Sequence, residues 1–283
     1  MSVTTKDLWE NSKTQVSLPP VEADEAHPAD DGYVPPVSSV KLPSRGLVYP
    51  GESPLYLLES VDIKPVTAKE ENILSSPVLI KKGTVLTTLM RACITNRSID
   101  PDAMLVGDRN AILTAIRVSA YGPQYQARVT CPECGEASDH DFDLGRLSLK
   151  TLDVPPVGGP GSNLFEFKLP VCGRTARFKL MDAQTVAALD RDVEAIRKKT
   201  GQEQAVTLRL QAQVVSLSGV TDPKKLASAL ADLPARDSRA LRIYMDQIAL
   251  GVDMVQEFEC SACGKSSEVE IPIGTEFFWP SEE

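Results

Sequence analysis

Two Cys-x-x-Cys-Gly elements, far apart in this 283-residue chain, constrain its fold more than any other feature. The first contains Cys131 and Cys134, and the second contains Cys260 and Cys263. Two thiolates at this spacing can hold one metal ion from a tight turn, and two such turns supply the four sulfur ligands of a closed tetrahedral zinc site. If all four cysteines bind one ion, the chain between the two pairs is a long insertion that begins and ends at the metal.

The residues around the two elements alternate in the same way. Acidic residues alternate with apolar ones over 139–144 after the first pair and over 268–273 after the second, and the residues before each pair alternate as well. This period is typical of half-buried strands. Each half is therefore predicted to be a strand, a Cys-x-x-Cys-Gly turn and a strand, and the glycine provides the backbone freedom that such a turn needs. Two such halves around one ion form a zinc ribbon.

Two other uses of the cysteines fit the sequence less well. A redox Cys-x-x-Cys motif favours a neighbouring βαβ pattern, which the flanks do not show. Disulfides would suit a secreted chain, but no signal peptide is visible. We therefore predict one structural Zn²⁺ per chain, because four thiolates leave no position open for a substrate or water. His140 aligns with Val269 and is expected on the inner face of the strands, whereas Cys93 and Cys172 are expected to be inert thiols.

Composition and charge exclude several classes of protein. The formal net charge of −9 argues against a dedicated nucleic-acid binder, which would show a basic face. No apolar run approaches the roughly 18 residues of a membrane span. Unpaired cysteines together with a zinc site fit folding in a reducing cytoplasm. The chain has no phosphate loop, nucleophile elbow or dinucleotide fingerprint and only two histidines, so we expect neither an enzyme nor a small-molecule binder.

Four segments are expected along the chain. Residues 1–40, rich in proline and acidic residues, predict an arm that is flexible or docked on a partner through Trp9 and Tyr33. Residues 41–150 predict an α/β region with the first cysteine pair, and residues 251–283 contain the second pair and an aromatic C-terminal tail. Between them, residues 151–250 predict a β-hairpin and a small helical bundle. The expected fold class is α+β, with a zinc-ribbon-like pair of hairpins, an N-terminal helical region and this insertion.

The local signals predict individual elements. Strands are expected at 47–49, 55–64, 164–169 and 175–180. A capping box at Thr67 and Glu70 predicts a helix through Leu74 that ends before Pro77. Further helices are expected from Gly83, over 108–121, and in the insertion over 182–199, 203–217, 222–233 and 234–250.

Several blocks of the sequence resemble one known family. The segment 42–50 (LPSRGLVYP), the blocks 63–74 and 80–85, the two cysteine elements and the ending 277–280 (FFWP) are similar to baseplate hub assembly proteins of contractile-tailed bacteriophages. The resemblance covers about residues 40–283. It implies a role in the virion or its assembly, partners such as hub, tube or wedge proteins, and a location in the tail baseplate, with the host cytoplasm as the place of assembly. It leaves open whether the chain remains in the finished particle.

The functional surfaces are expected away from the metal, in the arm, the 42–50 block and the aromatic C-terminus. Phe277, Phe278 and Trp279 are consecutive. They could form a last strand packed on the core, or an exposed group of anchors for a partner, since aromatic residues are frequent in binding hot spots. The leading function is a structural or assembly component of a phage baseplate. The alternative is a cytoplasmic zinc-ribbon regulator, which would bind nucleic acid in a salt-dependent manner.

Overall fold

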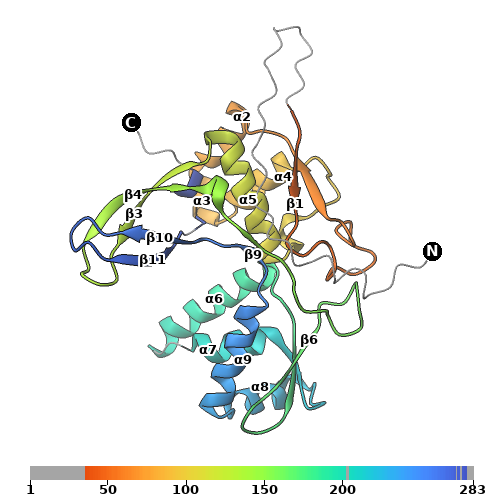
Figure 1. Cartoon of the computed structure of the whole chain (residues 1–283). Coiled ribbons are helices and arrows are strands. Elements are labelled where there is room, and N and C mark those ends of the chain that lie inside the picture. The colour runs from red at the N-terminus through yellow and green to blue at the C-terminus, as the bar shows by residue number, and fades with distance from the viewer. Residues whose placement is uncertain (1–35, 202–203, 272, 275, 279–283) are drawn as a thin grey trace.

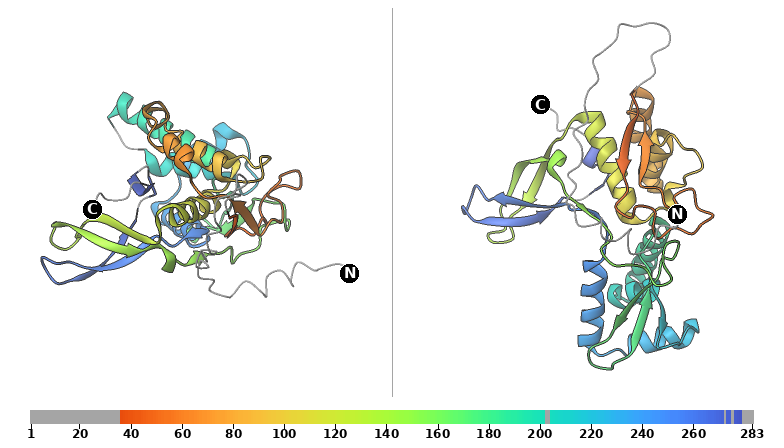
Figure 2. Two further views of the ribbon diagram at one scale, coloured as in Figure 1. Left: turned by 90° about the horizontal axis from the view of Figure 1, so that it is seen from above. Right: turned by 45° about the vertical axis from the view of Figure 1, so that its right-hand side comes forward.

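The computed structural model describes residues 36–201, 204–271, 273–274 and 276–278 (Figure 1). It mixes helices with small antiparallel sheets, as the α+β prediction requires. Two elongated hairpins lie side by side on one flank, and the helical insertion extends below the N-terminal helices. Both views of Figure 2 keep these two hairpins adjacent. Trp9, Tyr33 and Trp279, which we expected to contact partners, lie outside the described residues.

The N-terminal region begins with a short sheet and continues with helices. Strand β1 (Ser38–Lys41) pairs antiparallel with β2 (Ser60–Ile63). The helices that follow are α2 (Ala68–Leu74), α3 (Pro77–Lys82), α4 (Val85–Cys93) and α5 (Val106–Tyr121). The predicted capping box is present at the start of α2, where Thr67 and Glu70 bind each other's backbone N–H groups. Helix α2 ends at Leu74, before Pro77, as predicted. The sequence did not predict α3, in which Pro77 occupies the first turn, where its missing N–H costs nothing.

The 42–50 block is part of the core and not a surface, which corrects the sequence-based expectation. Residues 42–44 and 46–49 are buried, and their backbone forms successive turns where we predicted a strand over 47–49. The carboxylate of Asp108 on α5 accepts hydrogen bonds from the Ser44 N–H (2.9 Å) and the Tyr49 hydroxyl (2.7 Å). The same hydroxyl accepts from the Leu105 N–H at 2.9 Å. These contacts hold the block on the first turn of α5.

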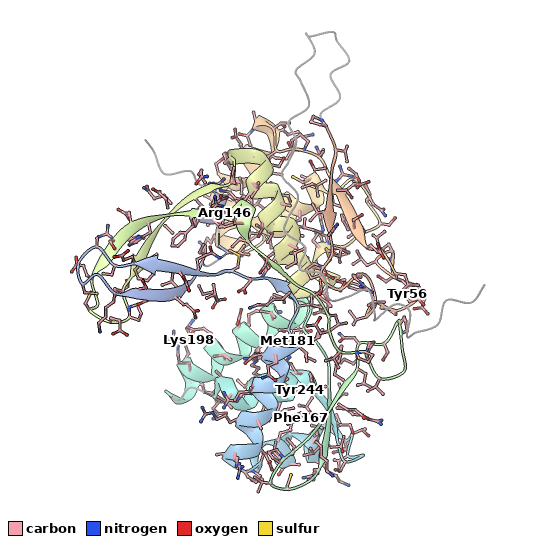
Figure 3. All side chains as sticks on the ribbon, viewed as in Figure 1. Tyr56, Arg146, Phe167, Met181, Lys198 and Tyr244 are labelled. Carbon is pink, nitrogen blue, oxygen red and sulfur yellow. The ribbon has the colours of Figure 1, made fainter. Side chains whose placement is uncertain are left out.

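The insertion contains one three-stranded sheet and four helices in its described part. Its strands are β6 (Phe165–Lys168), β7 (Thr175–Phe178) and β8 (Val214–Leu217), and its helices are α6 (Ala183–Thr200), α7 (Ala205–Gln213), α8 (Pro223–Ala231) and α9 (Ala235–Gln247). The expected hairpin is confirmed by the pairing of β6 with β7. Figure 3 shows Phe167 of β6 next to Tyr244 of α9, and their rings stack at 4.7 Å.

One helix of the insertion ends earlier than predicted. We expected a helix over 203–217, but α7 stops at Gln213 and the chain continues as β8 along the edge of β7. Val214 and Val215 are β-branched residues that favour a strand once a partner edge is available. The sheet therefore overrides the helical spacing of Val206, Leu210, Val214 and Leu217.

The insertion leaves and rejoins the rest of the chain at one place. Strand β5 (Leu149–Lys150) pairs with β9 (Gly251–Val252), so that both ends of the insertion are hydrogen-bonded to each other. Helix α5 passes directly beside this point. A Cβ added at Gly107 would lie 2.0 Å from the Leu250 carbonyl oxygen, so only glycine allows this approach.

The C-terminal aromatic residues pack inside the molecule. Phe277 and Phe278 form part of a 3₁₀ turn (Glu276–Phe278), and both side chains are completely buried. Buried Arg117 of α5 donates to the Phe277 carbonyl at 2.8 Å, and the Phe277 ring contacts Tyr125 at 5.1 Å between centroids. Of the two alternatives for Phe277 and Phe278, their burial supports packing on the core, although they lie in a 3₁₀ turn and not in a strand. Neither side chain is exposed to serve as an anchor for a partner.

Candidate metal centre

Both cysteine pairs lie in the turns of β-hairpins, as the alternation predicted. Strand β3 (Gln124–Thr130) pairs with β4 (Ala137–Asp143), and β10 (Val255–Glu259) pairs with β11 (Ser266–Glu270). Figure 1 shows the two hairpins extending in the same direction from the body, although they come from distant parts of the chain. Their turns meet at the far end.

The two turns have the same backbone hydrogen bonds. In the first, the Cys131 N–H donates to the Glu136 carbonyl at 2.8 Å, and the Gly135 N–H donates to the Cys131 carbonyl at 2.9 Å. In the second, the equivalent bonds of Cys260 and Gly264 measure 3.0 and 2.8 Å. Both glycines have positive φ, 77° and 67°, and an added Cβ would meet no atom at either position. The glycines are therefore required by the backbone conformation and not by space.

The four cysteine sulfurs form one cluster. All four Sγ atoms lie within 4.8 Å of one another. The Cys131–Cys263 and Cys134–Cys260 Sγ distances are 3.9 and 3.7 Å. A disulfide would bring two sulfurs to about 2.05 Å, and all four cysteines are free. With Zn–S bonds of about 2.3 Å, four sulfurs at the corners of a tetrahedron lie about 3.8 Å apart. The closest sulfur distances fit this geometry.

The protonation of the cluster also favours a cation. Backbone N–H groups of Cys263 and Ala262 lower the pKa of the Cys260 thiol to about 7. For Cys134, a hydrogen bond from the backbone of Glu136 lowers the pKa, but burial and hydrogen bonds with the other three thiols outweigh it and raise the pKa to about 12. Several adjacent thiolates repel one another without a counter-ion. A bound metal supplies that charge and deprotonates its ligands.

Contacts between the hairpins surround the cluster. The Lys265 ammonium of the second turn pairs with the Glu133 carboxylate of the first at 2.6 Å. Both side chains are exposed, so the pair orients the turns more than it stabilises them. His140 lies on the inner face, as predicted, and its ring meets Phe258 of the other hairpin edge-on at 4.9 Å. His140 is not among the clustered ligand atoms.

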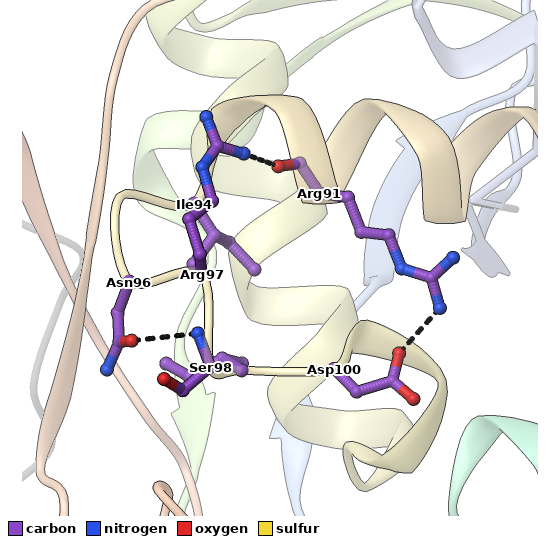
Figure 4. Close-up of a pocket in the computed structure, with 7 residues that line it drawn as sticks. Arg91, Ile94, Asn96, Arg97, Ser98 and Asp100 are labelled. Atoms are coloured by element: carbon purple, nitrogen blue, oxygen red, sulfur yellow. Dashed lines mark hydrogen bonds and ion pairs between the residues drawn. The ribbon is translucent and has the colours of Figure 1, made fainter.

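The remaining candidate groups offer little chemistry. Cys93 is buried, and burial raises its pKa to about 12, whereas Cys172 is exposed in the β6–β7 turn. Figure 4 shows a pocket beside α4 in which Arg91 pairs with Asp100 at 2.7 Å and Arg97 donates to the Arg91 carbonyl. These pairings occupy the charged groups of the pocket within the chain. Its lining, completed by Ile94, Asn96, Ser98 and Ile99, contains no acid–base pair beside a nucleophile.

Comparison with known proteins gives one match. The family model described as T4 bacteriophage base plate protein matches residues 37–279, which include every described strand and helix. No curated protein and no solved structure matches the chain. In the part of the chain that the structure describes, no helix combines the length and apolarity needed to cross a bilayer.

Proposed function

The chain belongs to the family of T4 bacteriophage base plate proteins, and from this membership we propose that it is a structural or assembly component of a contractile-tail baseplate, in the hub region. The observation that carries the proposal is the extent of the match, which runs from before β1 to the C-terminal aromatic residues. The role is non-catalytic and proceeds through contacts with other tail proteins of the hub, tube or wedge. Assembly takes place in the host cytoplasm.

The metal contributes to this role by fixing the fold. One Zn²⁺, bound by Cys131, Cys134, Cys260 and Cys263, joins the two hairpins into a zinc ribbon. The short sulfur–sulfur distances support this assignment. Four thiolates close the coordination sphere, so the ion acts as a structural link and not as a Lewis acid. Structural zinc contributes about 10–16 kcal/mol in small zinc-finger peptides, so its removal is expected to open the hairpins.

The same proposal divides the chain into three functional parts, of which the body consists of two segments. Residues 41–150 and 251–283 form the metal-linked body, and residues 151–250 form the insertion. Residues 1–40, of which the last three enter strand β1, form an arm that docks on a neighbouring tail protein. The β5–β9 pairing, at the boundary between body and insertion, supports this division. Trp9 and Tyr33 are the proposed anchors of the arm.

The location can be tested in the phage that encodes this chain. Virions and tail-assembly intermediates are purified from cells that produce an epitope-tagged copy, and both fractions are analysed by mass spectrometry and antibody-labelled electron microscopy. The proposal predicts that the antibody label lies at the baseplate end of the tail. A structural component would be labelled in the virion, and an assembly factor would be labelled in the intermediates. A major capsid protein is the positional control. A chain absent from both fractions would contradict the proposal.

A further inference from the structure

Helix α9 presents a basic face that no other described element covers. Arg236, Arg239, Ile243 and Gln247 follow one another at helical spacing and are exposed, and Ile243 retains 46% of its accessible surface. In the described part of the chain, neither Arg236 nor Arg239 makes an ion pair or hydrogen bond. The one carboxylate on this face, Asp246, is paired with Arg209 at 2.6 Å. The face therefore combines one apolar residue with two cations that form no ion pair, although Arg236 also interacts electrostatically with the neighbouring Asp237.

Arg242 lies at the border of the same face and has one hydrogen-bond donor without a partner. Its Nε atom is buried and has no hydrogen-bond partner, a unique case among the described side chains. Buried donors are normally paired, and an unpaired one costs about 1–3 kcal/mol.

The outer face of the second hairpin has the opposite charge. Glu257, Glu259, Glu268 and Glu270 are exposed around Val255, which retains 40% of its surface. Glu257 lies directly opposite Glu268 in the β10–β11 register, an arrangement that destabilises a hairpin. None of the four carboxylates forms an ion pair or hydrogen bond within the described residues. The charges are also segregated in the sequence, since residues 251–283 contain eight acidic residues and one basic residue.

We propose that these two faces bind each other between copies of this chain. The basic face of α9 (Arg236, Arg239, Ile243) on one copy lies against the acidic face of β10–β11 (Val255, Glu257, Glu268) on the next. The two surfaces match in size, because a 13-residue helix is about 20 Å long and a five-residue strand about 17 Å. Each also has one exposed aliphatic side chain flanked by charges that form no ion pair in the described part of the chain, so the contact pairs opposite charges around an apolar centre.

The symmetry and strength of the contact follow from its composition. Two different surfaces meet, so the contact is heterologous and produces a ring or an open chain of copies and not a two-fold dimer. The faces are smaller than those of stable complexes, so the association is weak and requires high local concentration. Since both faces are exposed, added salt weakens it.

The experiment compares two charge-reversed variants of the full chain. Variant one carries Glu257→Lys and Glu268→Lys, and variant two carries Arg236→Glu and Arg239→Glu. Sedimentation velocity at low salt is expected to show concentration-dependent association of the unchanged chain. Each variant alone should associate at least about tenfold more weakly, because each then presents two faces of like charge.

The equimolar mixture of the two variants gives the decisive readout. The basic sheet face of variant one complements the acidic helix of variant two, and the remaining two faces keep their original charges. Association should therefore return in the mixture. Asp139→Lys with Asp141→Lys, two exposed residues on the outer face of β4, is the matched control and should associate as the unchanged chain does.

Thermal unfolding of each variant verifies that it is folded. In variant one, the Glu257–Glu268 pair becomes a Lys–Lys pair, so the like-charge repulsion within the hairpin is similar to that in the unchanged chain. An unchanged chain that stays monomeric at low salt overturns the proposal, as does a mixture that remains unassociated. Loss of association in the Asp139 and Asp141 variant also overturns it. Since the readout is self-association, its failure would leave the location of the chain in the baseplate unaffected.

Discussion

Replacement of Tyr49 by Phe tests how the buried 42–50 block is held on α5. The Tyr49 hydroxyl donates to Asp108 at 2.7 Å and accepts from the Leu105 N–H at 2.9 Å. Asp108 is completely buried, and Ser44 also donates hydrogen bonds to its carboxylate. Phenylalanine keeps the ring but leaves one carboxylate oxygen and one backbone N–H without a partner.

The expected cost follows from these two groups. A buried polar group that loses its partner costs about 1–3 kcal/mol, and more if it is charged. Two such groups give a loss of about 2–6 kcal/mol in the free energy of unfolding. This is a large part of the roughly 5–15 kcal/mol that stabilises a typical domain.

The pH dependence of the loss has a defined sign. Burial raises the pKa of Asp108, and the hydrogen bonds from Ser44 and Tyr49 partly offset this. A carboxyl whose folded pKa is raised stabilises the fold below its unfolded pKa and loses that contribution as pH rises through the folded value. Without the Tyr49 hydroxyl the pKa of Asp108 rises further, so the variant should lose more stability at pH 8 than at pH 5.

Urea denaturation at both pH values measures the effect, with the slope m checked for constancy. Tyr56→Phe is the matched control, because the Tyr56 side chain is partly exposed and its hydroxyl makes no hydrogen bond in the described part of the chain. It should change stability by less than about 0.5 kcal/mol. A Tyr49→Phe variant as stable as the control would refute the buried network.

Two further replacements test other parts of the account. For Glu70, burial raises the carboxyl pKa, but hydrogen bonds from Thr67 and Lys64 outweigh it and lower the pKa from 4.5 to about 2. Glu70→Gln should therefore lower the free energy of unfolding by about 2–3 kcal/mol at pH 7, and by progressively less as pH falls from 4.5 towards 2. Urea titrations at several pH values measure this loss. A loss that is equal at all pH values argues against the pairing of Glu70 with Thr67 and Lys64. Arg117→Met removes three hydrogen bonds to backbone carbonyls and should cost about 2–4 kcal/mol, against less than about 0.5 kcal/mol for exposed Arg128→Met.

The cysteine hairpins could be predicted because their signals are local. Polar and apolar residues alternate over 124–130 and 137–143, and a turn motif lies between these segments. This pattern predicts both the two strands and their pairing. The repeat of the same pattern at 255–270 then indicated which elements meet. The inner position of His140 followed from this alignment and is confirmed by its contact with Phe258.

The misassigned elements depend on contacts between distant residues. Val214 and Leu217 have helical spacing with Leu210, but they pair with β7, about 40 residues earlier, and local periodicity contains no information about that edge. The 42–50 block looked exposed because its turn residues are typical of loops. Its burial depends on Asp108 of α5, which lies 64 residues after Ser44 in the sequence.

The metal content of the purified chain shows whether the four clustered cysteines bind one zinc ion. Elemental analysis of freshly purified, reduced protein should give one zinc per chain. Cys131→Ser and Cys260→Ser should each lose most of that zinc, whereas Cys172→Ser, a replacement at an exposed cysteine outside the cluster, should retain it. Absence of metal from the unchanged chain, or full zinc content in the Cys131→Ser and Cys260→Ser variants, would contradict the account.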